Sequence, residues 1–190
     1  MARDYLNQPF NQMRRVDRSK DDDWIKAFLK RGDFGVMASS QEGQPFTNTR
    51  QYVYDQSANA IYMHGAKTGR TPAIIEANNR VCFSVSQMGR LIPADEAVEV
   101  SVEFAGVMLF GRVTTVDDQA EATHALQLLM DKYFPHLKPV EDYRPIELKD
   151  LKITAVFRID IDSWSGKEKK VAGDPPGAFL WESVALKDKV

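Results

Sequence analysis

A short basic segment near the middle of the chain is the first candidate for chemistry. Residues 64–70, His-Gly-Ala-Lys-Thr-Gly-Arg, follow the apolar run 60–63. Thr71 and Pro72 come next and predict a helix start, because Thr is a good N-cap and Pro suits the first helical position. Lysine, arginine and the free N–H groups of a helix start together bind phosphate. The pattern predicts either a site for a phosphorylated ligand or a solvated connection between a strand and a helix.

A polar interruption in a neighbouring predicted strand bears on the same site. Five consecutive polar residues, 47–51, lie within the otherwise apolar and aromatic segment 45–54. Because side chains alternate between the two faces of a strand, each face receives some of them. A face that looks into the core needs partners, which a polar heterocycle with a phosphate tail would supply. A barrel exterior or a subunit interface explains the pattern equally well. One face carries Asn48 and Arg50 with Phe46 and Tyr52, and the other carries Thr47, Thr49 and Gln51.

The other reactive residue types form no catalytic constellation. The three histidines, His64, His124 and His136, lack metal-ligand spacing, so we expect no metal site. The single cysteine, Cys82, lies between apolar neighbours and is interpreted as a buried structural thiol. His64 is either a strand-end histidine bonded to the backbone or a hydrogen-bond donor or proton carrier beside the ligand.

Trp164 and Lys167 follow the last predicted strand, residues 153–161. Two interpretations are open for them. They form a surface tryptophan that covers the core with a solvated lysine beside it, or an aromatic group and a cation that close over a ligand held by the other subunit.

Size and composition exclude several classes of protein. The chain has 190 residues, of which 43% are hydrophobic and 27% charged, as in one soluble domain with tails. Its net charge of −2 provides no basic surface for nucleic acid. No apolar run approaches the roughly 20 residues that span a bilayer, and the first residues lack an apolar signal core. With one cysteine and no internal disulfide, the chain is expected to be cytoplasmic.

The predicted elements are short, mostly β and separated by turns, which favours antiparallel pairing. Ser19 is expected to cap a first helix that ends at Gly32, and residues 87–99 to form a long connection of the kind that often binds ligands. The elements predict an α+β, mainly β, barrel with helical caps rather than a βαβ fold. Strands are expected at 34–40, 45–54, 60–64, 81–85, 100–116 and 153–161, and further helices at 71–78 and 120–133.

An ordered set of short motifs resembles a known family. In this order they are similar to the FMN-binding split-barrel proteins related to pyridoxamine 5′-phosphate oxidase, especially the branch that holds the nitroimidazole-resistance (Nim) proteins. The resemblance covers about residues 14–168. The motifs are Arg14-Arg15 with Asp17-Arg18, Gly35-Val36-Met37-Ala38, Gly43-Gln44-Pro45, Tyr62-Met63-His64-Gly65-Ala66, Gly69-Arg70, Asn78-Asn79-Arg80-Val81-Cys82-Phe83, Phe110-Gly111-Arg112, Tyr143-Arg144-Pro145, Ile159-Asp160-Ile161 and Gly166-Lys167.

The resemblance implies a six-stranded antiparallel Greek-key split barrel with small flanking helices, usually a homodimer with two FMN molecules at its interface. Residues 1–18 would then be an arm, 19–168 the FMN-binding domain and 169–190 a tail whose apolar residues 178–181 dock on something, such as a partner subunit. The resemblance implies that the FMN phosphate is bound by Lys67, Thr68, Gly69 and Arg70, with Arg50 reaching it. The flavin ring and ribityl chain would contact Asn48, Thr49, Gln51, Met63 and His64. Trp164 and Lys167 would act across the dimer.

The activity that the resemblance implies is that of an FMN-dependent oxidoreductase. A reduced nicotinamide, NADH or NADPH, would supply electrons, and a nitro compound, a quinone or another flavin would accept them. The chain lacks the C-terminal arginine and histidine pattern with which pyridoxamine-phosphate oxidases bind their substrate, so vitamin B6 oxidation is not expected. A flavin-binding carrier or sensor without turnover is the alternative, and a heme-linked split-barrel protein is a further one.

Overall fold

The fold is a curled antiparallel sheet with small helices beside it. The computed structural model describes residue 4 and residues 6–185. Within them the main path of the eight-stranded sheet runs β3-β2-β6-β7-β8-β5-β4, and β1 pairs with β8. The strands are β1 (Ser19–Lys20), β2 (Gly35–Gln41), β3 (Gln44–Arg50), β4 (Val53–Asp55), β5 (Ala60–Ala66), β6 (Arg80–Ile92), β7 (Ser101–Thr115) and β8 (Thr154–Lys169). The helices are η1 (Val16–Arg18), α1 (Asp22–Arg31), α2 (Arg70–Ala77), α3 (Gln119–Tyr133), η2 (Asp150–Lys152) and α4 (Trp181–Ala185).

The two edge strands of the sheet are consecutive in the chain, so a short link joins edges that do not pair with each other. β3 and β4 lie at opposite ends of the strand order, yet only Gln51 and Tyr52 separate them. The main chain of Tyr52 bonds to α3 instead of to a strand: its N–H donates to the Tyr133 hydroxyl oxygen at 3.0 Å, and its carbonyl accepts from Lys132 Nζ at 3.0 Å. The predicted single strand at 45–54 is therefore wrong. It is two strands, which with β1 raise the count above the six expected.

Apolar side chains form two separate cores. The first fills the barrel and includes Phe83, Phe157 and Met63, with the inner face of α1 closing one side. The second lies outside the barrel, where α3 packs its buried Ala125 and Leu129 on β4, β5 and β8. Burial on alternate faces of β5 and β8 follows from the period of two along a strand. The predicted fold class, α+β and mainly antiparallel β with small flanking helices, is confirmed.

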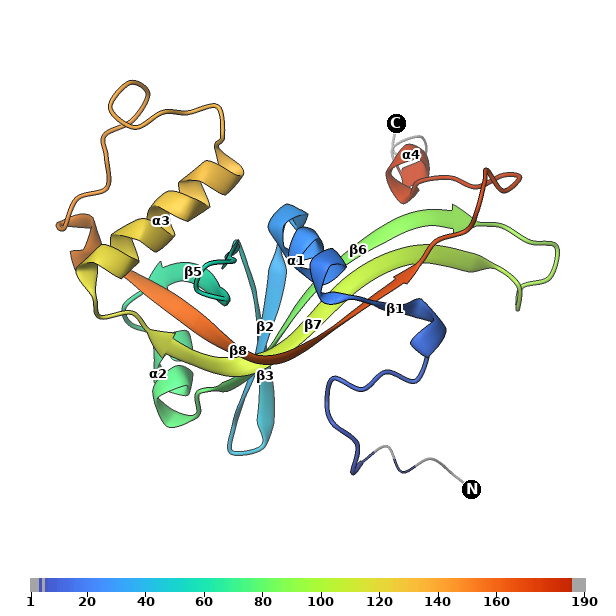
Figure 1. The fold of residues 1–190 in the computed structure, drawn as a ribbon, viewed down its shortest axis with the longest axis horizontal. Coiled ribbons are helices and arrows are strands. Elements are labelled where there is room, and N and C mark those ends of the chain that lie inside the picture. Colours follow the sequence, from blue (N-terminus) through green and yellow to red (C-terminus); the bar gives the residue numbers. More distant parts are fainter. Residues whose placement is uncertain (1–3, 5, 186–190) are drawn as a thin grey trace.

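Two strands, β6 and β8, are longer than the sequence predicts, whereas β7 lies within the predicted strand at 100–116. β6, β7 and β8 extend together beyond the barrel (Figure 1) and contain 13, 15 and 16 residues. The predicted connection 87–99 is wrong in its first part, because β6 passes a bulge after Met88 and pairs with β7 again at Leu91. β8 does not end at residue 161, because β7 continues to provide a partner as far as Lys169.

The segment after β8 docks on its own chain. Phe179 pairs with Leu91 of β6. The Glu103 carboxylate accepts from the N–H of Val171 at 2.8 Å and forms an ion pair with Arg90 at 2.8 Å. The apolar cluster at 178–181 was expected to dock, and part of it finds its partner within the chain. It therefore provides no support for a second subunit.

The first helix begins two residues later than predicted. Asp21, not Ser19, is the N-cap of α1, and its carboxylate accepts from the N–H of Trp24 at 2.8 Å. Ser19 lies in β1 opposite Lys167. In the part of the chain that the structure describes, no helix is both long and apolar enough to cross a membrane.

Candidate functional site

The basic loop connects the end of β5 to the start of α2. Lys67 and Thr68 are exposed in it, as are Gly69 and Arg70. Gly69 has a φ of 120°, which side chains with a Cβ rarely adopt, so glycine is required at the turn into the helix. The guanidinium of Arg70 lies over the ring of Phe46 in β3, 5.3 Å from its centroid. The loop thus presents two cations to solvent next to β3.

The first turn of α2 has no side-chain cap. Gly69 is the N-cap, and no side chain accepts from the first N–H groups of the helix. The predicted N-cap role of Thr71 is wrong because its hydroxyl is used elsewhere. Thr71 Oγ1 accepts from Asn48 Nδ2 at 3.2 Å and from Arg50 Nη2 at 2.9 Å. The helix start therefore offers free N–H groups and a positive dipole end to an anion.

Arg50, the last residue of β3, lies behind this helix start. Its Nη1 donates to the carbonyl of His64 at 2.9 Å, and its guanidinium lies 5.5 Å from the ring centroid of Phe157. Its Nε atom is buried and has no hydrogen-bond partner. Burial lowers the pKa of Arg50, and no carboxylate of the described residues opposes that effect. A partly buried cation whose neighbours are all neutral is stabilised by an anion.

Gly65 makes room for the Arg50 guanidinium. A Cβ at Gly65 would lie 2.8 Å from Arg50 Nη1 and 3.2 Å from a ring carbon of Phe157. The neighbouring His64 is exposed on the other face of β5, and its pKa is lowered by partial burial of the ring and by the charge of Arg50. The imidazole is therefore neutral at pH 7 and can both donate and accept hydrogen bonds.

The predicted alternation along β3 is present. Phe46, Asn48 and Arg50 are half-buried on the face that meets α2, whereas Thr49 and its odd-numbered neighbours are exposed. Gln51 is half-buried in the link between β3 and β4. Met63, also predicted to line a ligand, is fully buried in the barrel core, so only its backbone is available there.

Trp164 and Lys167 lie far from the basic loop in one chain. β8 pairs with His64 at Val156, and the two residues come eight and eleven positions later, roughly 26 and 36 Å along an extended strand. Trp164 Nε1 donates to Asp22 at 2.8 Å, and Lys167 Nζ lies 5.5 Å from the ring centroid of Phe104. Their role across a dimer stays a prediction.

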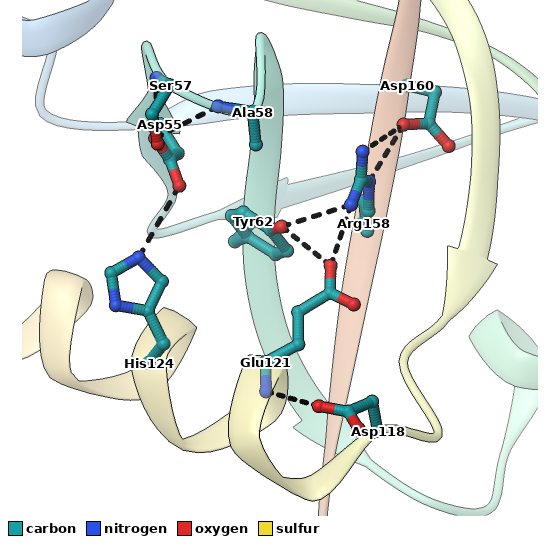
Figure 2. A network of polar contacts seen from close by, with 9 residues as sticks. All are labelled: Asp55, Ser57, Ala58, Tyr62, Asp118, Glu121, His124, Arg158 and Asp160. Carbon is teal, nitrogen blue, oxygen red and sulfur yellow. Dashed lines mark hydrogen bonds and ion pairs between the residues drawn. The ribbon is translucent and has the colours of Figure 1, made fainter.

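A polar network that sequence reasoning missed attaches α3 to the sheet (Figure 2). Glu121 accepts from the Tyr62 hydroxyl at 2.6 Å and from Arg158 Nη1 at 2.8 Å, and Arg158 also pairs with Asp160 at 2.7 Å. The Tyr62 hydrogen bond and then Arg158 lower the pKa of Glu121, while Glu121 raises the pKa of Arg158. The only sequence signal was an arginine inside an apolar strand, since its partners are far away in the chain.

Solved structures of other proteins share this fold. A search of curated proteins gave no match. Three solved structures are similar. They are the flavocytochrome Anf3 of Azotobacter vinelandii (25% identity, 93% of this chain and 78% of that one, TM-score 0.74), an FAD and heme binding protein of Mycobacterium smegmatis (19%, 90% and 80%, TM-score 0.72) and a candidate 5-nitroimidazole antibiotic resistance protein of Bacteroides thetaiotaomicron VPI-5482 (20%, 78% and 84%, TM-score 0.65). The family model described as pyridoxamine 5′-phosphate oxidase matches residues 21–168. The chain therefore belongs to the pyridoxamine 5′-phosphate oxidase family.

Proposed function

We propose that the protein binds a flavin by its phosphate at the basic loop, with FMN as the cofactor. The observation that carries the proposal is Arg50, a cation with a buried, unpartnered Nε and no carboxylate among its described neighbours. It lies beside the uncapped start of α2. A phosphate would satisfy both groups at once, through charge-assisted hydrogen bonds to the guanidinium and to backbone N–H groups.

The remaining site residues would divide the flavin between them. Lys67 and Arg70 contribute charge at the phosphate, and Thr68 and Gly69 contribute loop hydrogen-bond donors. The β3 residues Asn48, Thr49 and Gln51, the backbone of Met63 and the neutral imidazole of His64 are available to the ribityl chain and ring. Trp164 and Lys167 would take part from the second subunit. The fit is good at the phosphate end, where the structure leaves a cation without an anion.

Relatives support a flavin over other phosphorylated ligands. The Azotobacter protein is a flavocytochrome and the Mycobacterium protein binds FAD and heme. We propose that the present chain is likewise a flavoprotein, acting as an FMN-dependent oxidoreductase in the cytoplasm. The flavin supplies the redox chemistry when bound. The chain's own residues bind its phosphate, orient its ring and shield it from water.

The proposed electron donor and acceptor are those expected of an FMN-dependent oxidoreductase. NADH or NADPH is the proposed donor, and a nitro compound, a quinone or a second flavin the acceptor. Anaerobic mixing with NADH or NADPH, followed by reoxidation with each acceptor in a stopped-flow instrument, tests turnover. Reduction and reoxidation faster than with free FMN support the oxidoreductase. Rates equal to those of free FMN favour a carrier or sensor.

Heme is a second candidate ligand, because two of the similar structures are heme proteins. The visible spectrum of the purified protein distinguishes the cofactors. A flavin is expected to give two absorption bands, whereas heme gives an intense Soret band at about 400 nm.

We also propose a homodimer that uses the outer face of the sheet. Val36, Ser84, Met108 and Ser165 form one row across β2, β6, β7 and β8. Met108 is 43% exposed and Val36 37% exposed, and Ser84 lies between them in the row. Ser84, Met108 and Ser165 also line a hollow of about 550 Å³. Exposed apolar side chains beside a hollow suit association of two copies. Light scattering at micromolar concentration should give twice the monomer mass of 21.5 kDa, and a monomer mass would rule the dimer out.

One experiment tests the flavin directly. Whatever copurifies with the protein is released and identified by mass and absorption spectrum, and the emptied protein is titrated with FMN by fluorescence. Arg70→Ala should weaken FMN binding by about 1.5–3 kcal/mol, the usual size of a charge-assisted hydrogen bond. An unchanged affinity would count against the loop as the phosphate site.

A further inference from the structure

A cavity of about 730 Å³ adjoins the basic loop, and Arg50 is not among the residues that line it. Lys67 of the loop and Pro72 of α2 form one wall of it. The other walls are the end of β7, the first turn of α3, residues 148–152 and the beginning of β8. Its volume lies within the range of pockets that enclose a nucleotide-sized ligand. The cavity and the proposed phosphate site therefore share a side chain, Lys67.

Positive charge gathers around this cavity. Lys67, Lys149 and Lys152 line it, against one carboxylate, that of Asp117. Within the described residues, Lys149 pairs with Glu147 at 2.7 Å, while Lys67 and Lys152 form no ion pair. Ammonium groups that face one space repel one another, and a shared anion removes that repulsion. The charge pattern therefore favours an anionic ligand.

The same cavity has an apolar part. Leu148, Leu151 and Val116 contribute to it, as does buried Ala122 of α3. The α3 wall is held in place by the hydrogen bonds of Glu121 to Tyr62 and Arg158 (Figure 2). An apolar surface next to cations matches a ligand with a flat base at one end and a phosphate at the other. The Asp117 carboxylate can accept from ribose hydroxyls.

We propose that this cavity binds the adenosine monophosphate half of FAD, whose flavin half is held at the basic loop. The inference rests on the proposed flavin site at the basic loop and makes FAD, rather than FMN, the flavin that fits the chain best. FMN ends at its phosphate, whereas FAD continues from that phosphate into a second phosphate and adenosine. A cavity that begins at Lys67 receives this continuation. A nicotinamide dinucleotide carries the same adenylate group, but its nicotinamide must reach the flavin ring, at the opposite end of the ribityl chain from the phosphate.

Paired titrations of the emptied protein with FMN and FAD test the proposal. FAD should bind about tenfold or more tightly than FMN, since it gains charge-assisted contacts that FMN lacks. Lys152→Gln should weaken FAD about three- to tenfold and leave FMN within about twofold. Lys138→Gln removes the same charge outside the cavity and should change neither affinity. Leu148→Trp, at a residue 57% exposed and so tolerant of size, should fill the cavity and abolish the preference for FAD.

Two results would overturn the cavity assignment and leave the flavin site standing. One is equal affinity for FMN and FAD in the unaltered protein. The other is a Lys152→Gln protein whose KM for NADPH rises while its FAD affinity is unchanged, because the adenylate then belongs to the reductant. Failure of the proposed function looks different, since neither flavin would then bind, or Arg50→Gln would leave both affinities unaltered.

Discussion

Two partly buried arginines on the sheet have opposite surroundings. Arg158 of β8 has two carboxylates within 2.8 Å, those of Glu121 and Asp160. Arg50 of β3 has a carbonyl, a hydroxyl and an aromatic ring, and its Nε has no partner. Glu121 raises the pKa of Arg158, whereas burial lowers that of Arg50. The charge of Arg158 is neutralised within the fold, and that of Arg50 is left for a ligand.

The contrast matters because an arginine seen in a sequence gives no hint of which kind it is. A paired arginine fastens one element to another, here α3 to the sheet. An arginine with neutral neighbours raises the energy of the empty protein and lowers that of the protein with an anion bound. Whether a buried arginine has a carboxylate partner, more than how deeply it is buried, indicates whether its role is structural or ligand-binding.

The largest expected effect is on flavin binding by Arg50→Gln. Loss of a charge-assisted hydrogen bond to phosphate should reduce FMN affinity about 10- to 100-fold. Arg158→Gln serves as the matched control, and its FMN affinity should stay within about twofold of the unaltered protein. Fluorescence titration measures both. Equal losses of FMN affinity in the two variants would show that Arg50 has no special role in binding the phosphate.

The next effect is on stability, where substitution of Arg158 should cost more than substitution of Arg50. Arg158→Met leaves the Glu121 carboxylate with Tyr62 alone and should reduce the free energy of unfolding by about 1 kcal/mol, a modest value because both side chains are about 30% exposed. Arg50→Met removes a desolvated cation beside Phe157 and should change stability less. Urea unfolding in the absence of flavin compares them. A larger loss for Arg50→Met would show that its neutral contacts do more than position it.

A smaller effect is expected from Gly65→Ala. The added methyl group would meet Arg50 Nη1 at 2.8 Å and must displace the guanidinium, whose end is flexible. FMN affinity should fall about two- to fivefold while all charges remain, since the cation is moved rather than removed. Isothermal titration of the variant gives the affinity, and circular dichroism confirms its fold. Full affinity in a folded variant would mean that Arg50 need not hold its observed position.

The smallest effect is the pH dependence of the Arg158 network. The pKa of Glu121 is lowered in the folded chain, so its stabilising contribution is complete above the unfolded value of about 4.3 and is lost as pH falls through the folded value. The difference in melting temperature between the unaltered protein and Glu121→Gln should be greatest at pH 7 and shrink below about pH 4. A difference that is constant from pH 7 to pH 3 would contradict the pairing.

Local patterns in the sequence predicted much of the arrangement. The antiparallel sheet class and the alternation along β3 follow from spacing and turn residues, since each depends on neighbours in the chain. The family was identified from the resemblance of an ordered set of short motifs. The loop of Lys67 and Arg70 was found in the same way. These features need no knowledge of which strands meet.

Long-range pairing was the part that the sequence did not reveal. Residues 45–54 read as one strand because nothing local indicates that Tyr133 will bond the main chain of Tyr52. Thr71 looked like a cap because its competitor for the hydroxyl, Arg50, is 21 positions away. Glu121 and Arg158 were missed for the same reason, being 37 positions apart.

The contacts of the C-terminal segment extend beyond residues 21–168, the part that the family model matches. A chain shortened to those residues would lose Phe179, and the outer side of β6 at Leu91 would become an open edge. It would also lose Val171, which donates to Glu103. Open strand edges recruit other chains. Expression of the family-matched portion alone should therefore yield a protein that aggregates more readily than the full chain, as light scattering of the two would show.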